Sequence, residues 1–291
     1  ASRFVLMQCE QAGVDPKTID TLPEKEDLSP ADRAMLSKEQ AIIERVTSAL
    51  HEYRLSEVGE ALYGYVWDDY CDWYLELSKG NANIAVLVHT LRKILILLHP
   101  YCPFVTEELW AAVKKKDAGN LIAEPWPALK PERRDEEAEA GFRMLIDVIT
   151  AIRKLRIEQG VEAGKEISAI VRTSKWVEFL ESQESHIRRM GKVNSLTFVT
   201  DKPDMKDTAA AFLDGIEIYL PLAGLVDKDK EKVSLTKEKE NLEKFAKGIE
   251  AKLSNDDFVA KAPPALVEDQ KVKLEEEKGK LSKIGERLKN L

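Results

Sequence analysis

The sequence predicts a mainly α-helical protein, with a helical bundle followed by a small α/β module and a C-terminal antiparallel coiled-coil hairpin. Three patterns lead to this fold class. Apolar residues recur every three to four positions through most of the first 160 residues, alternate with polar residues after Lys165, and follow heptads after residue 228. We therefore expect three domains: the bundle at 1–160, the module at 161–227 and the arm at 228–291.

Five helices are expected in the bundle. The first begins at Pro30, with Ser29 as its N-cap, and runs to about Tyr53. Proline suits the first helical position because its missing N–H group has no partner there in any case. The other four are expected over residues 55–77, 82–98, 103–115 and 135–158. Helices joined by short links are typical of a bundle.

An aromatic cluster falls within the second of these helices. Its members are Tyr63, Tyr65, Trp67, Tyr70, Trp73 and Tyr74. They cover more than one helical face, so they cannot all lie in one core. We expect Tyr70 and Trp73 in the core, and Trp67 or Tyr74 as the candidate for an exposed surface on which an unpaired base stacks.

The period changes from 3.6 to 2 in the predicted α/β module. Ile167, Ala169 and Val171 alternate with polar residues, and residues 196–199 form a second short strand. A helix is expected near 175–184, and a turn at 186–190. The dipeptide Asp214-Gly215 predicts a two-residue hairpin turn between strands at 210–212 and 216–220, because it tolerates positive φ angles.

The predicted arm carries two heptad seams. They are Leu235, Leu242, Phe245, Ile249 and Leu253, and Leu274, Leu281, Ile284, Leu288 and Leu291. A break at 254–257 separates them, and the first helix would be about 36 Å long. Residues 228–291 hold 16 Lys and Arg against 14 Asp and Glu, whereas the whole chain holds 44 against 52. The arm is therefore the part suited to polyanions.

No enzyme signature is found in the sequence. It contains neither GxGxxG nor GxxxxGK[ST], and no spacing typical of a catalytic group, so we expect no catalytic residue. Cys9, Cys71 and Cys102 form no CxxC pair, and we expect no metal site and a reducing compartment. The longest apolar run, 84–98, is too short to cross a membrane, and we expect none to be crossed.

Basic residues gather where the last bundle helix ends. Arg153, Lys154 and Arg156 occupy its final turns, where positive charge complements the helix C-terminus. Phosphate contact is a second explanation for the same residues. The sequence leaves both open.

Several strings together resemble valyl-tRNA synthetase, a family of class I aminoacyl-tRNA synthetases. They are ASRFVL at 1–6, ALY at 61–63, WDDYCDWYLE at 67–76, LHPYCPFVTEELW at 98–110, AIR at 151–153, PLAGLVD at 221–227 and KLSNDDFVAKAP at 252–263. The resemblance runs the full length of the chain. The last string and the surrounding hairpin favour the valyl enzyme over the isoleucyl one, whose relatives typically end in a zinc segment with paired cysteines.

The resemblance implies a tRNA-recognition region. The bundle would bind the anticodon of tRNA(Val) and the arm the tRNA elbow, so that a catalytic domain elsewhere in the protein charges the tRNA with valine. The HIGH and KMSKS signatures and the editing domain would precede Ala1, so we expect a piece of a longer protein that is inactive by itself. ATP and Mg²⁺ would serve the full-length enzyme, and no cofactor is expected in this piece. The catalytic and editing domains would be its partners, in a cytoplasmic monomer.

The resemblance also suggests site residues. Arg3 and Phe4 are the candidates for anticodon contact, by their position in the first string. Lys244, Lys247 and Lys278 are the candidates for the elbow, as basic residues between seam positions. Arg153 and Arg156 are the further candidates for phosphate contact.

Two alternatives remain. A non-catalytic helical scaffold could pair with another protein through its coiled coil, because heptads do not show whether their partner lies in the same chain. The chain could also be the equivalent region of an isoleucyl or leucyl enzyme.

Overall fold

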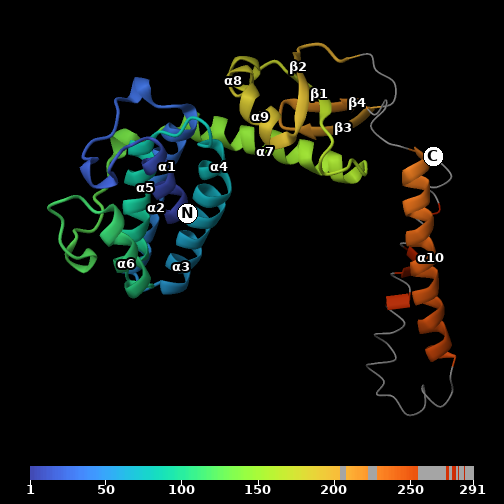
Figure 1. The fold of residues 1–291 in the computed structure, drawn as a ribbon, viewed down its shortest axis with the longest axis horizontal. Helices are drawn as coiled ribbons and strands as arrows, with labels where there is room; N and C mark the ends of the chain where they lie inside the picture. Colours follow the sequence, from blue (N-terminus) through green and yellow to red (C-terminus); the bar gives the residue numbers. More distant parts are fainter. Residues whose placement is uncertain are drawn as a thin grey trace. The chain divides into compact units, whose positions relative to one another are not determined.

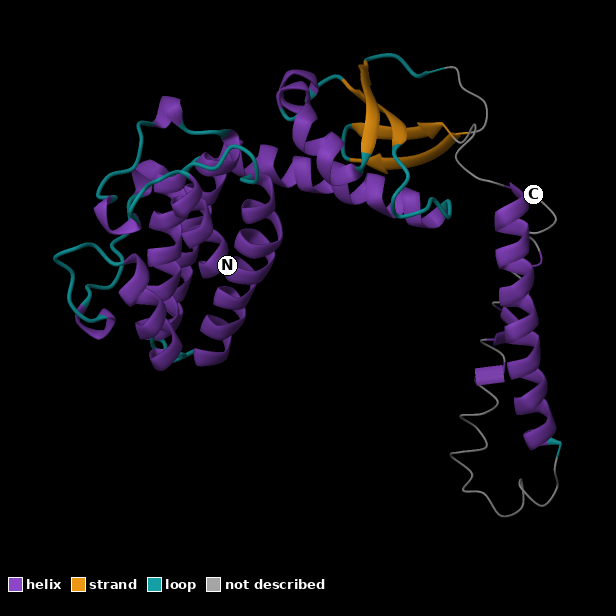
Figure 2. Cartoon of the chain, in the orientation of Figure 1, coloured by secondary structure: helices purple, strands orange, loops and turns teal. Residues whose placement is uncertain are grey.

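The computed structural model describes residues 1–203, 208–221 and 228–254, together with residues 273, 274, 277–279, 281 and 285. Most of these residues are helical, and one sheet is present, which confirms the predicted mainly α fold (Figures 1 and 2). Two compact units are found. One comprises residues 1–151, 173–191 and 213–215, and the other 152–172, 192–212 and 216–291. The predicted three-domain division stays a prediction.

The first unit is built around a helical bundle (Figure 1). The helices of its continuous part are α1 (Ser2–Gln11), α2 (Pro30–His51), α3 (Leu55–Gly64), α4 (Leu75–Leu77), α5 (Ile84–Leu98), α6 (Pro103–Val113) and the start of α7 (Glu136–Glu158). Single 3₁₀ turns lie at Pro16–Thr18, Lys25–Asp27, Leu121–Ala123 and Pro131–Arg133. The two further helices assigned to this unit are α8 (Val177–Ser182) and α9 (Glu184–Gly191).

The start of α2 agrees with the sequence prediction. The Ser29 hydroxyl accepts a hydrogen bond from the backbone N–H of Asp32 at 3.1 Å, and the Asp32 carboxylate accepts one from the Ser29 N–H at 3.1 Å. This reciprocal capping box satisfies two backbone donors that have no partner within the helix. Asn83 caps α5 in a similar way, accepting from the N–H of Val86 at 3.2 Å.

Helix α1 was not predicted from the sequence. It has ten residues and no side-chain cap, so it lacks the usual start signal. Val5 and Cys9, one turn apart, are fully buried in the core of the bundle, and α1 packs against α5. Packing against the other helices therefore holds a segment whose local sequence gives little indication of a helix.

The predicted helix over 55–77 is interrupted by a π-helical segment, η3 (Tyr65–Tyr74), between α3 and α4. A π-helix forms hydrogen bonds from i to i+5, so residues four or five apart share a face. Tyr65, Tyr70 and Tyr74 follow this spacing, and all three are buried. The sequence reading assumed a period of 3.6 throughout.

The sheet has four strands in the order β2-β1-β4-β3. Their bounds are β1 (Ile167–Thr173), β2 (Val193–Val199), β3 (Thr208–Leu213) and β4 (Ile216–Pro221). Strands β1 and β2 are parallel, and β1 alternates buried with half-buried residues, as predicted. Gly215 has a φ of 72° in the predicted turn between β3 and β4, a conformation that glycine adopts without strain.

Helix α10 (Lys228–Leu253) corresponds to the first predicted arm helix. Ala246 and Ile249 are buried, and Leu242 and Leu253 are half-buried, so a seam runs along positions 242, 246, 249 and 253. Phe245, which was predicted to lie in this seam, is exposed. Ala246 takes the place of Phe245 in the seam. The spacings of four, three and four residues between positions 242, 246, 249 and 253 are as regular as those of the predicted seam. Most of the second predicted seam, and with it the hairpin, lies outside the described residues.

No helix among the described residues is long and apolar enough to span a membrane.

Candidate nucleic-acid interface

Helix α1 presents the two predicted anticodon residues differently. Arg3 is exposed, and its side chain has no hydrogen-bond or ion-pair partner among the residues that the structure describes. Phe4 is half-buried and packs against the core of the bundle. Arg3 is therefore available to a ligand, whereas only part of the Phe4 ring is.

The aromatic cluster is divided between the core and the surface. Tyr70 and Tyr74 are fully buried, and Trp73 is half-buried. The proposal that Tyr74 offers a stacking surface is therefore wrong, because the π-helical segment turns it inward. The Tyr74 hydroxyl donates a hydrogen bond to the Asp32 carboxylate at 2.6 Å.

Trp67 is exposed, as expected if Trp67 and not Tyr74 offers the stacking surface. It also has an exposed aromatic neighbour that was not predicted from the sequence. Tyr63, one turn earlier, is 63% exposed and Trp67 is 54% exposed. Their rings stack in parallel, with centroids 6.1 Å apart and an interplanar angle of 10°. The spacing of four residues is the signal that could have identified the pair. A flat, solvent-facing aromatic surface of this kind can accept an unpaired base.

Acidic residues surround this aromatic pair. Asp68 and Asp72 are exposed on the same π-helical segment, whereas Asp69 forms an ion pair with Lys38. Two free carboxylates repel phosphate groups. The pair is therefore suited to the face of a base and not to the RNA backbone.

The two arginines at the end of α7 differ in their surroundings. Arg153 is exposed, whereas Arg156 is 7% exposed. The Arg156 guanidinium donates to the carbonyl oxygens of Lys192 at 3.2 Å, Glu162 at 3.2 Å and Lys165 at 2.7 Å. Burial lowers its pKa. These contacts give Arg156 a structural role within the second unit, and we no longer include it among the phosphate contacts.

Two lysines of α10, Lys244 and Lys247, face away from its seam. Lys244 and Lys247 are exposed and lie on the side of the helix opposite Leu242 and Ile249. Lys278 is also exposed, but its Nζ atom lies 3.0 Å from Oε1 of Glu250. Lys278 is thus partly neutralised by a carboxylate, whereas Lys244 and Lys247 form no ion pair within the described part of the chain. These two are the stronger candidates for phosphates.

Within the described ranges, no three His, Cys, Asp or Glu side chains are grouped so that they could hold a metal ion.

Two known families match separate parts of the chain. Residues 32–171 match the anticodon-binding domain of tRNA ligases. Residues 227–291 match the tRNA binding arm of valyl tRNA synthetase. The two matches define the class: a tRNA ligase region with an anticodon-binding domain and a tRNA binding arm.

Curated relatives identify the family within this class. The chain is 35% identical over 303 residues to valine-tRNA ligase of Enterococcus faecalis, 32% over 303 residues to that of Bacillus subtilis and 35% over 299 residues to that of Thermotoga maritima. All of this chain is covered in each comparison, but only 34%, 34% and 33% of the relatives. The chain belongs to the valine-tRNA ligase family and spans about a third of the length of these relatives.

Proposed function

We propose that this chain is the tRNA-recognition region of a valine-tRNA ligase, in which the bundle binds the anticodon and the arm binds the tRNA elbow. The observation that carries the proposal is the order of two family matches on one chain, an anticodon-binding domain followed by a valyl arm. The arm match favours tRNA(Val) over the tRNAs of the isoleucyl and leucyl enzymes.

The bundle has side chains suited to unpaired bases. Sequence-specific recognition of RNA relies on loops whose bases are splayed out, stacked on aromatic or guanidinium planes and read along their edges. Arg3 supplies an exposed guanidinium, and the stacked pair Tyr63 and Trp67 supplies an exposed aromatic surface. Each could take one base of the anticodon loop.

The arm has side chains suited to the RNA backbone. A folded tRNA elbow offers shape and phosphates, with few base edges within reach. Helix α10 has 26 residues, a length of about 39 Å. Lys244 and Lys247 on its outer side can neutralise phosphates without reading sequence. Lys278 and Arg153 are secondary candidates for the same role.

Charging tRNA(Val) with valine belongs to the full-length enzyme. The residues here do not fit a site for ATP and Mg²⁺, because the sequence has neither the HIGH nor the KMSKS string and no phosphate-binding glycine loop. We assign the reaction, with its ATP and Mg²⁺, to catalytic and editing domains outside this sequence. A cytoplasmic monomer is the setting we propose.

The test compares tRNA(Val) with the same tRNA carrying altered anticodon bases, by fluorescence anisotropy on the purified chain. We expect at least about fivefold weaker binding of the altered tRNA, since one lost base contact costs about 1–3 kcal/mol. Arg3→Gln should weaken binding of tRNA(Val) and reduce this discrimination. Equal affinity for both tRNAs contradicts the assignment of the bundle.

Arg143→Gln is the matched control for Arg3→Gln. Arg143 is an exposed arginine on α7, so its replacement removes the same charge from the same unit. It should lower affinity for both tRNAs slightly and leave their ratio unchanged. A change in the ratio as large as that of Arg3→Gln would show a general charge effect instead of anticodon reading.

A further inference from the structure

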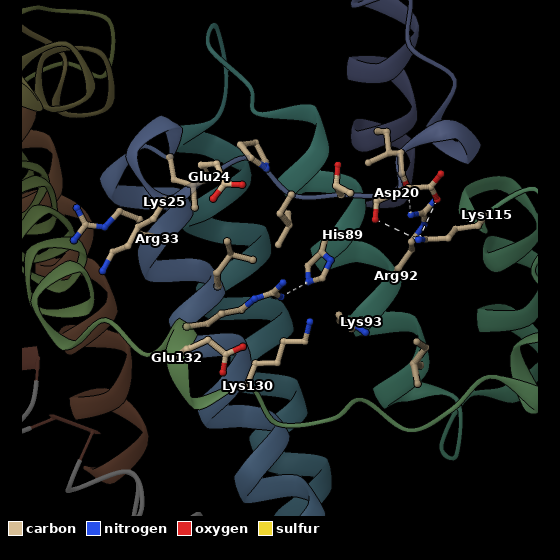
Figure 3. A pocket seen from close by; sticks show the side chains of 18 of the residues that line it. Asp20, Glu24, Lys25, Arg33, His89, Arg92, Lys93, Lys115, Lys130 and Glu132 are labelled. Atoms are coloured by element: carbon tan, nitrogen blue, oxygen red, sulfur yellow. Dashed lines mark hydrogen bonds and ion pairs between the residues drawn. The ribbon is translucent and has the colours of Figure 1, made fainter.

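A pocket of about 690 Å³ lies within the first unit, apart from the surfaces described above (Figure 3). Its walls come from the loop at 19–28, from α2, α5 and α6, and from the loops at 115–118 and 124–135. The apolar part of its lining includes Leu28, Ile96 and Trp110. The volume falls within the range of about 300–1,000 Å³ that small-molecule sites occupy.

Part of the charge that lines the pocket is balanced within the protein. Asp135 lies 3.1 Å from Lys25 and 2.7 Å from Arg33, and Asp20 lies 3.0 Å from Lys115. These groups hold the rim together. Because they already have partners within the protein, we do not expect these groups to bind a ligand.

Arg92 is buried in the wall and bonded to the backbone. Its guanidinium donates to the carbonyl oxygens of Val113, Ile19 and Pro16 at 2.6, 2.6 and 2.8 Å. These bonds use three of the five N–H groups of the guanidinium, and no carboxylate lies within ion-pair distance of it among the described residues. Arg92 thus adds a positive field to the pocket.

Three other cations converge without a carboxylate partner. Lys93, Lys130 and Arg133 line the pocket, and none forms an ion pair within the described part of the chain. In Figure 3 the labelled side chains of Lys93, Lys130 and His89 point into the same space. Nη1 of Arg133 lies 3.4 Å from Nε2 of His89, which is itself 3.0 Å from Oε1 of the buried Glu39. The charges of Lys130 and Arg133 act on the Lys93 amine, and an anion bound between them would relieve this repulsion.

The electrostatics of Lys93 reflect this convergence. Burial lowers the pKa of its amine, the charge of Glu39 opposes that change, and the charges of Lys130 and Arg133 reinforce it. Glu124 is half-buried in the lining, and its charge also opposes the lowering of the Lys93 pKa. Two more carboxylates, Glu24 and Glu132, line the pocket but are exposed. Lys130 is exposed as they are, whereas Lys93 and Arg133 are half-buried and Arg92 is buried, so the deeper part of the pocket is more positive than its rim.

We propose that this pocket binds a phosphate group, which Lys93, Lys130 and Arg133 hold while the apolar wall formed by Leu28, Ile96 and Trp110 accommodates the rest of the ligand. A phosphate matches the donors because it carries up to two negative charges and several acceptor oxygens. Arginine forms two parallel bonds to such a group, and lysine adds point charges from other directions.

Binding is measured by isothermal titration calorimetry on the 291-residue chain, with inorganic phosphate and with adenosine monophosphate, in a chloride buffer of low ionic strength. We expect saturable binding of both, tighter for the nucleotide because its base can use the apolar wall. Lys93→Met and Arg133→Gln should each weaken binding at least about tenfold, since one charged hydrogen bond contributes about 1.5–3 kcal/mol. No saturable binding at millimolar concentrations overturns the proposal.

Lys116→Met is the matched control. Lys116 is exposed, is close to Lys115 in sequence and does not line the pocket. Its replacement should leave the affinity for phosphate unchanged. Lys93→Met should unfold at the same or a higher temperature, because it removes a half-buried amine, so lost binding cannot be attributed to lost structure. Equal affinities of Lys93→Met and Lys116→Met for phosphate would contradict the site.

A second measurement distinguishes the two sources of phosphate. If the ligand is a backbone phosphate of RNA, Lys93→Met weakens tRNA binding more than Lys116→Met does. If the ligand is a small molecule, the two variants bind tRNA equally and only the phosphate titration separates them. The phosphate titration uses no tRNA, so its outcome does not depend on the proposed function.

Discussion

The hydroxyl of Tyr74 donates a hydrogen bond to Oδ1 of Asp32 at 2.6 Å, while Oδ2 of the same carboxylate closes the capping box at the start of α2. Both residues are buried, at 1% and 5% exposure. One carboxylate therefore joins the π-helical segment to the first turn of α2. Neither the cap nor the aromatic cluster, read alone in the sequence, indicates that they share this group.

Tyr74→Phe should destabilise the protein by about 1–3 kcal/mol, because it leaves a buried carboxylate oxygen without its donor. The ring itself is retained, so packing changes little. Chemical denaturation followed by circular dichroism measures the loss. Tyr63→Phe is the control: this hydroxyl is on an exposed ring, and we expect a change within about 0.5 kcal/mol. Equal stability of the two variants would show that the bond contributes nothing.

Stability should also fall in alkali. Burial raises the pKa of Tyr65, Tyr70 and Tyr74 above the usual 10.0, and for Tyr65 and Tyr74 the charges of Glu39 and Asp32 add to the effect. In the unfolded chain these phenols ionise near their usual pKa. Above about pH 10 the unfolded state thus releases protons that the folded state keeps, and the free energy of unfolding decreases. Below that pH the contribution is complete.

Denaturation between about pH 9 and about pH 11 measures this dependence, and each phenol steepens the fall by at most about 1.4 kcal/mol per pH unit. Tyr70→Phe combined with Tyr74→Phe should make the fall less steep. A slope that these substitutions leave unchanged would place the alkaline transition elsewhere.

The sequence predicts those parts of the fold that depend on interactions between residues close together in the chain. The α2 cap and the β3–β4 turn are local, and Ser29 and Gly215 indicate them directly. Helix α1 and the π-helical segment depend on packing by residues distant in sequence, and both were missed. Tyr74 was placed on the wrong face for that reason.

In the candidate site, too, the sequence predicts what depends on neighbouring residues and misses what depends on distant ones. Exposure of Lys244 and Lys247 follows from their position between seam residues, and the sequence predicted it. Arg156 was grouped with Arg153 because both end α7, but its three carbonyl acceptors come from a loop and from the residue before β2. The pocket combines side chains from several segments that are distant in the sequence, so no sequence motif marks it.

Arg156→Gln should destabilise the second unit by about 2–4 kcal/mol, because it removes the charged donor of three hydrogen bonds to backbone carbonyl oxygens. Arg156→Lys should recover only part of the loss, since an ammonium group cannot reach three acceptors in the way a planar guanidinium does. Lys154→Gln is the control, because Lys154 is exposed and has only a 3.9 Å ion pair with Glu158. Thermal unfolding compares the three. Full recovery by lysine would indicate that only the charge of Arg156 matters.

Gly141→Ala should destabilise the first unit. An added Cβ would lie 2.8 Å from two ring atoms of Phe179, and such overpacking costs about 1–3 kcal/mol, more than the gain of about 1 kcal/mol from alanine in a helix. Adding Phe179→Leu should restore part of the loss. In α10, Gly248→Ala meets no atom within 4 Å and should stabilise its helix. If Gly141→Ala stabilised the protein as well, the ring of Phe179 would have to move at little cost.

The arm makes a separate prediction about salt. Each phosphate that a cation neutralises releases counterions, so the logarithm of the affinity falls with the logarithm of the salt concentration by up to about 0.9 per contact. Replacing Lys244 and Lys247 together by Met should lower this slope for tRNA(Val) by up to about 2 and weaken binding of every tRNA by a similar factor, because phosphates carry no sequence. Lys239→Met should change the slope less, since Glu243 lies 3.8 Å from Lys239 and already offsets its charge. Anisotropy titrations at several salt concentrations measure these slopes. If the double variant kept the slope of the unaltered chain, the outer side of α10 would not belong to the interface. If the double variant bound only tRNA(Val) more weakly, Lys244 and Lys247 would have to contact bases, which two lysines on a helix are poorly placed to do.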